Sequence, residues 1–179
     1  MTRHEFMLRL NRDVTAEEVE ALYEAGCADA SVETGALGTM LDFSRESPTL
    51  PEALVSAVRD VEKVPGLHAV GIACDNMVSQ LVIADRVGVT REAVRLWATA
   101  QRGPGGFPPC ALVTSGGEQV WDWQQVAEWL QAYRGPRPDA DVRLRVLCTA
   151  DRVLAARAAL RSEPDDAVRE EFERLLEDA

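Results

Sequence analysis

The first 75 residues alternate between the two-residue apolar period of β-strands and the longer period of helices. A T-x-x-E capping box at Thr15 and Glu18 opens the first helix, Gly26 closes it, and the same spacing recurs at Thr49. The predicted strands lie at residues 6–10, 30–34, 38–43 and 67–73. The order βαββαβ predicts a ferredoxin-like domain over residues 1–75, with two helices on one face of an antiparallel sheet.

Residues 76–134 change to helical periods that are separated by turn residues. Ser79 is a predicted N-cap, Gly88 can adopt the positive φ of a tight turn, and Thr90 caps a second helix that ends near Ala100. The positions expected to be buried are Leu81, Ile83, Ala84, Val87, Val89, Val94 and Trp97. This spacing predicts a helix-turn-helix, although an ordinary helical hairpin can imitate it.

The next stretch contains too much glycine and proline for a helix. Residues 102–110 read RGPGGFPPC, and the chain up to Gly117 is predicted to form a short hairpin, or wing. An amphipathic helix follows in VWDWQQVAEWL. Its apolar side contains Trp121, Val126, Trp129 and Leu130, whereas Trp123 is the tryptophan expected at the surface.

The C-terminal third begins with a linker, residues 135–140, identified by its proline and glycine content. Residues 142–147 alternate like a strand, but the Ala-, Leu- and Arg-rich composition favours a helix from about Asp141. A last helix is expected to begin near Asp165. The helical segment 141–179 either supplies a dimer contact or packs against the central domain. The whole chain is therefore predicted to be an α+β protein.

The central segment resembles the winged helix-turn-helix domains of excisionase-like and MerR-like DNA-binding proteins. The matching residues are Ile83-Ala84, Gly88-Val89, Val94, Trp97, Phe107-Pro108 and Val126–Leu130. The chain is also similar to small helix-turn-helix regulators of high-GC bacteria, which share the DFSRE stretch Asp42–Glu46 and the QRGPGGFP motif Gln101–Pro108. These resemblances imply that the helix after Thr90 reads the major groove of DNA.

The net charge of −11, taken alone, argues against a nucleic-acid ligand, but the charge is distributed unevenly. Residues 1–75 hold 14 acidic and 6 basic residues, and residues 139–179 hold 11 and 7. Residues 76–138 hold 5 acidic and 6 basic residues. The acidity therefore belongs to the flanking regions, and the central segment is compatible with DNA.

A local basic patch surrounds the second helix of the central segment. Between residues 86 and 102 four arginines accompany one acidic residue, and arginine is well suited to guanine and phosphate contacts. The candidate DNA-binding residues are Ser79, Gln80, Arg86, Thr90, Arg91, Glu92, Arg95, Gln101 and Arg102. Arg91 and Arg95 are the predicted base-reading residues, and Arg86, Arg102 and the wing are expected at the DNA backbone. Alternatively, these arginines pair with Asp85 and Glu92 on a solvated face.

No catalytic or metal-binding pattern emerges from the sequence. Only two histidines occur, and Cys27, Cys74, Cys110 and Cys148 are too scattered for a zinc site, so we expect buried thiols in a reducing cytoplasm. No apolar run approaches the length of about 18 residues typical of a membrane span. We expect a non-enzymatic protein without a cofactor.

These observations favour a cytoplasmic, nucleoid-associated transcriptional regulator that binds double-stranded DNA as a homodimer. The acidic N-terminal domain would then sense a signal or assemble the protein. One alternative is an antitoxin-like or adaptor protein, whose acidic regions cover a basic protein partner. Another is a small-molecule sensor or enzyme built on residues 1–75.

Overall fold

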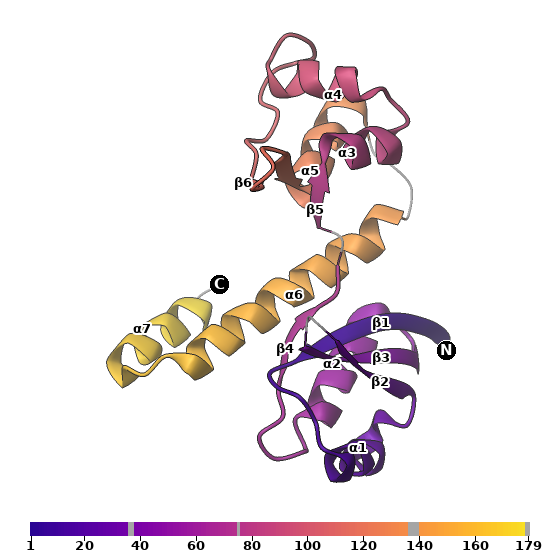
Figure 1. The fold of residues 1–179 in the computed structure, drawn as a ribbon, viewed down its shortest axis with the longest axis vertical. Coiled ribbons are helices and arrows are strands. Elements are labelled where there is room, and N and C mark those ends of the chain that lie inside the picture. The colour runs from indigo at the N-terminus through magenta and orange to yellow at the C-terminus, as the bar shows by residue number, and fades with distance from the viewer. Residues whose placement is uncertain (36–37, 75, 136–139, 178–179) are drawn as a thin grey trace. The chain divides into compact units, whose positions relative to one another are not determined.

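The computed structural model describes residues 1–35, 38–74, 76–135 and 140–177, and it is an α+β protein with two antiparallel sheets (Figure 1). The chain divides into two compact units. The first unit comprises Met1–Ala73 together with Val146–Ala179, and the second comprises Cys74–Arg145. None of the described helices is both long enough and apolar enough to cross a membrane.

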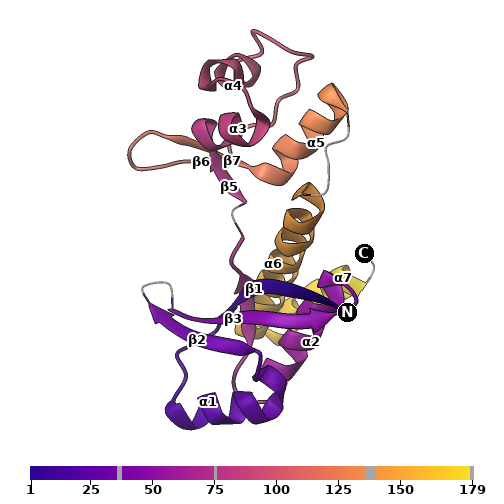
Figure 2. The same cartoon turned by 90° about the vertical axis from the view of Figure 1, so that its right-hand side faces the viewer.

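The first unit contains a four-stranded sheet in the order β2-β3-β1-β4. Its strands are β1 (Thr2–Leu10), β2 (Ala30–Gly35), β3 (Gly38–Ser47) and β4 (Ala69–Ile72). Helix α1 (Ala16–Leu22), which continues into the π-helical turn η1 (Tyr23–Cys27), and helix α2 (Leu50–Val61) lie on the same face of this sheet (Figure 2). The strands and helices predicted between residues 6 and 73 are therefore present in the predicted order.

Local sequence explains where these elements begin. The Thr15 side chain accepts a hydrogen bond from the backbone N–H of Glu18, whose own carboxylate accepts one from the Thr15 N–H, so the predicted capping box is present. Thr49 caps α2 through the N–H of Glu52. Alternate residues of β1 and β3, including Leu8 and Phe43, are fully buried beneath the helices. Apolar burial on one sheet face stabilises this unit.

Arg45, within the DFSRE stretch, is buried under the helices of the first unit. Its Nε and Nη2 atoms donate to the two carboxylate oxygens of Asp29, and its Nη1 atom donates to Asp60 and Ser56. Nη2 also donates to the carbonyl of Gly26 at 2.7 Å. Hydrogen bonding to Asp29, opposed in part by burial, raises the pKa of Arg45. Arg45 of the DFSRE stretch therefore belongs to an ion-pair network with Asp29 and Asp60 inside the first unit.

The C-terminal residues form helices α6 (Ala140–Ser162) and α7 (Asp166–Glu177). Residues 142–147 are helical, so the favoured prediction is confirmed over the strand alternative. Within the first unit, Oδ1 of Asp151 accepts a hydrogen bond from the N–H of Ile72 in edge strand β4 at 2.8 Å, and Arg157 pairs with Glu62. Residues 146–179 therefore group with the first unit, in contrast to the separate C-terminal segment expected from sequence. Residues 136–139 of the predicted linker lie outside the described residues.

The second unit combines three helices with a small sheet in the order β5-β7-β6. Its elements are β5 (Met77–Ser79), α3 (Gln80–Val87), α4 (Arg91–Ala98), β6 (Leu112–Val113), β7 (Gln119–Asp122) and α5 (Trp123–Arg134). Strand β5 was not expected. It pairs with residues 120–122, which the sequence placed in the following helix, and Asp122 then caps α5.

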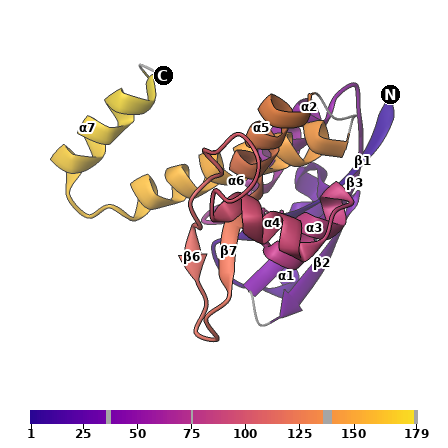
Figure 3. The ribbon, with the colours of Figure 1, turned by 90° about the horizontal axis from the view of Figure 1, so that it is seen from above.

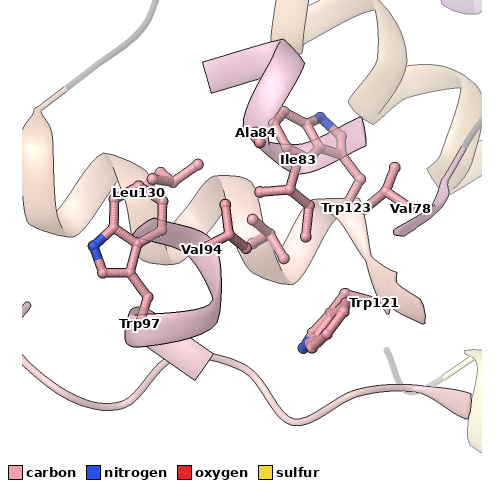
Figure 4. Packing of buried hydrophobic residues seen from close by; sticks show 9 residues of the cluster. Val78, Ile83, Ala84, Val94, Trp97, Trp121, Trp123 and Leu130 are labelled. Carbon is pink, nitrogen blue, oxygen red and sulfur yellow. The ribbon is translucent and has the colours of Figure 1, made fainter. Parts of the chain in front are cut away.

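Nine buried residues form the core of the second unit (Figure 4). They are Val78, Ile83, Ala84, Val94, Trp97, Trp121, Trp123, Val126 and Leu130. Two burial predictions are wrong. Leu81 is 63% exposed because it lies on the side of α3 opposite Ile83, and Trp123 is only 4% exposed because α5 begins there and turns its ring into the core.

Candidate nucleic-acid interface

A tight turn joins α3 to α4 and sets the direction in which α4 leaves the core. Gly88 ends α3 in the left-handed conformation at φ 68°, and the N–H of Val89 donates to the carbonyl of Ala84 at 2.9 Å. Ser79 caps α3 through the N–H of Val82, and Thr90 caps α4 through the N–H of Ala93. Both hydroxyls therefore serve as N-caps and stabilise the starts of α3 and α4.

Helix α4 has a buried side and an exposed side. Val94 and Trp97 are buried in the core, whereas Arg91, Glu92 and Arg95 are exposed. This separation follows from the helical period: Val94 and Trp97 lie together on the core side, Glu92 and Arg95 lie together on the opposite side, and Arg91 lies at the margin between the two sides. The exposed side therefore presents two guanidinium groups and one carboxylate on one short surface.

Glu92 and Arg95 form a two-point ion pair on this surface. Nε of Arg95 donates to Oε2 of Glu92 at 2.8 Å, and Nη2 donates to Oε1 at 2.7 Å. These hydrogen bonds lower the pKa of the Glu92 carboxyl and raise the pKa of Arg95. The pairing of an arginine with Glu92 was one alternative considered from the sequence. The structure contains such a pair, and the arginine is Arg95.

Arg91 lies in a different setting, beside an open polar cleft of about 330 Å³. The cleft is lined by Gln80 at the start of α3, by Arg91 and by the hairpin residues Gly116, Gly117, Glu118 and Gln119. Within the described ranges, the Arg91 side chain makes no ion pair or hydrogen bond. Its charge is available to an anionic ligand in or near the cleft.

The hairpin of β6 and β7 projects beyond the helices of the second unit (Figure 3). The backbone of Thr114 donates to Glu118 at 2.8 Å, and Gly117, at φ 80°, donates back to Thr114 at 2.9 Å. Residues 116–119 of this hairpin line the cleft, and they were not among the candidate binding residues named from the sequence. The Ser-Gly-Gly-Glu turn between Val113 and Val120 was the available signal.

Three other candidates, Arg86, Gln101 and Arg102, lie outside α4. The Arg86 guanidinium stands over the ring of Trp123, 5.0 Å from its centroid, so this side chain covers the core. Gln101 and Arg102 are exposed just beyond α4, and both backbone N–H groups donate to the carbonyl of Leu96. The structure thus gathers Gln80, Arg91, Glu92 and Arg95 around α4 and the cleft, while Arg86 serves packing.

The thiols and acidic groups offer no comparable arrangement. Burial raises the pKa of Cys27 to about 11, and the cysteines form no disulfide in the part of the chain that the structure describes. Across the same residues, no group of three or more His, Cys, Asp or Glu side chains is placed to hold a metal ion. The surface around α4 therefore remains the principal candidate site.

Comparisons of the chain with protein-family models, curated proteins and solved structures find no match.

Proposed function

We propose that the second unit is a winged helix-turn-helix that binds double-stranded DNA, with α4 in the major groove and the β6–β7 hairpin as the wing. The observation that carries this proposal is the two-sided character of α4. Its inner side is held in the core by Val94 and Trp97, while Arg91 and Arg95 face outward beside a projecting hairpin. A helix of this kind fits a major groove about 12 Å wide.

The cleft gives the proposal a second support. Arg91 and the glycine-rich hairpin tip both line a polar hollow. A phosphate of the DNA backbone that entered it would meet the guanidinium group of Arg91. Glu118, on the hairpin wall, would repel a phosphate placed too close to it. The net charge of +3 between residues 86 and 102 favours binding of DNA there, although the whole chain is acidic.

For the first unit we propose a ferredoxin-like fold that assembles the protein as a homodimer. Helix α7 supports the dimer, because Val168, Phe172 and Leu175 form one apolar stripe and are 38, 52 and 66% exposed. A second copy would cover this stripe and supply a second α4. Two reading helices are needed for stable binding, since one eight-residue helix carries few contacts.

The proposal is tested by selecting duplexes from a randomised pool with the intact protein. We expect one sequence to be enriched, and we expect R91A and R95A each to weaken its binding by about 1–3 kcal/mol. R59A removes an exposed arginine from α2 in the first unit and serves as the matched control. Tryptophan fluorescence verifies that the second unit is folded in R91A and R95A, because all four tryptophans lie in that unit. Full binding by both α4 variants would contradict the assignment of the reading helix.

The charge distribution favours one competing function. Residues 1–75 carry a net charge of −8, as expected of an antitoxin-like or adaptor protein that covers a basic partner. Purification of the tagged chain from its native source distinguishes the two. A stoichiometric basic protein together with the absence of any selected duplex would support the adaptor function.

A further inference from the structure

Glu92 presents a difficulty for any DNA-binding surface on α4. Glu92 directly follows Arg91 and lies one turn before Arg95, and its side chain is 61% exposed, so a free Glu92 would repel the phosphates on both sides of the groove. In the structure, however, both of its oxygens are engaged by Arg95. The pair has no net charge, and the repulsion is largely cancelled at the place where α4 would meet DNA.

The geometry of the pair leaves a specific part of Arg95 available. A guanidinium group has five N–H donors in one plane. Glu92 occupies the edge formed by Nε and Nη2, at 2.8 and 2.7 Å. Three N–H groups remain. One N–H of Nη1 and the second N–H of Nη2 form the terminal edge of the plane, and the other N–H of Nη1 points back toward Cδ. Two parallel donors on that edge match the O6 and N7 acceptors of guanine in the major groove.

The pair also restricts the motion of Arg95. An exposed arginine ordinarily samples many rotamers, and fixing it at an interface has a considerable entropic cost. The two hydrogen bonds to Glu92 hold the plane of the guanidinium group before any ligand arrives. Arg91, one turn earlier, has no such partner among the described residues and faces the cleft, which suits a less directional phosphate contact.

We infer that Glu92 is a positioning residue, which holds the terminal edge of Arg95 toward a guanine, so that the recognised sequence contains a guanine read by Arg95. This inference rests on the proposed DNA-binding function. It assigns Arg95 to base recognition and Arg91 to the backbone. It also gives Glu92 a favourable part in specificity, in place of the unfavourable one that its charge alone suggests.

The competing explanation is an ordinary surface ion pair within one helix. Such i,i+3 pairs stabilise helices slightly, and DNA phosphates could simply displace the carboxylate from Arg95. In that case removal of Glu92 would strengthen binding to all duplexes alike. The two explanations differ in base discrimination, which helix stability does not control.

The test uses the intact protein, the duplex enriched by selection, and duplexes in which each guanine is replaced in turn by adenine or by 7-deazaguanine, which lacks N7. For the wild type we expect one guanine in each half-site whose replacement by adenine weakens binding roughly tenfold or more. In E92A that ratio should fall to about twofold, and E92Q, which keeps one acceptor, should lie between. In R95A the same replacement should have no effect, with or without Glu92.

The control variant E128Q makes the same charge change on an exposed position of α5 and should leave the ratio unchanged. Unaltered or increased discrimination in E92A and E92Q would overturn the inference while leaving DNA binding intact. A guanine whose contribution depends on Arg91 and is insensitive to R95A would overturn it as well. Failure of the wild type to enrich any duplex would contradict the proposed function and, with it, the inference.

Discussion

Ala100, just beyond α4, has a left-handed backbone conformation that alanine disfavours. Its φ is 54°, and it is the only residue other than glycine with a positive φ among those described. The N–H of Gln101 donates to the carbonyl of Leu96, and the N–H of Ala100 donates to Trp97. These two hydrogen bonds form a Schellman motif, in which glycine usually occupies the position of Ala100.

We therefore expect A100G to raise the free energy of unfolding of the second unit by about 1 kcal/mol, because glycine avoids the clash of Cβ in this conformation. Denaturant unfolding followed by tryptophan fluorescence measures the change. A93G, inside α4, provides a control of opposite sign and should lower the same free energy by about 1 kcal/mol. Destabilisation by A100G would show that this end of α4 is not held in the left-handed conformation.

Single residues also show how far sequence predicts burial. Val94 and Trp97 were expected in the core and are buried there. The spacing of apolar residues along a helix shows which side of the helix is buried, and both residues lie on that side. Trp123 was expected at the surface and is buried under Arg86 from α3. That cover comes from a residue 37 positions away, and no local pattern contains it. The direction of Arg95 toward Glu92 likewise depends on rotamers that a sequence pattern leaves open.

Among the elements, helix starts were the most predictable feature. The capping residues Thr15, Thr49, Ser79 and Thr90 all serve as N-caps, since capping is decided by a side chain and a backbone N–H three residues away. Strand β5 was missed, and the start of α5 was placed too early. Both errors have one cause: β5 exists through its pairing with β7, more than 40 residues later along the chain.

The capping box of α1 predicts a pH dependence. Hydrogen bonding to Arg12, and then to the backbone of Thr15, lowers the pKa of Glu18 from 4.5 to about 2. Because the folded pKa is the lower one, the stabilisation of α1 is fully present above pH 4.5 and is lost as the pH falls from 4.5 toward 2. An NMR titration of the Glu18 carboxyl carbon should have its midpoint near 2.

R12A should move that midpoint upward, since it removes the largest cause of the lowered pKa. R59A leaves the hydrogen bonds of Glu18 with Arg12 and Thr15 in place and should not change the midpoint. A wild-type midpoint near 4.5 would show that the ion pair and the capping box do not persist in solution.

For the whole molecule, the distribution of charge decides what kind of binding we expect. The net charge of −11 opposes indiscriminate binding to DNA, while the central segment supplies a small basic surface. The division into two units could not be predicted in full, because residues 146–179 join the first unit through contacts such as that of Asp151 with Ile72. Asp151 and Ile72 are 79 residues apart in the sequence, so no local sequence pattern predicts this contact.

The central claim is that α4 and the hairpin bind DNA, and a salt titration with the selected duplex tests it most directly. Contact with several phosphates releases counterions, and each contact contributes about −0.9 to the slope of log K against log salt concentration. We predict a steep loss of affinity with added salt for the wild type, and a slope less negative by about one for R91A. A flat response of the wild type, or identical affinity for the selected and a scrambled duplex, would contradict the account.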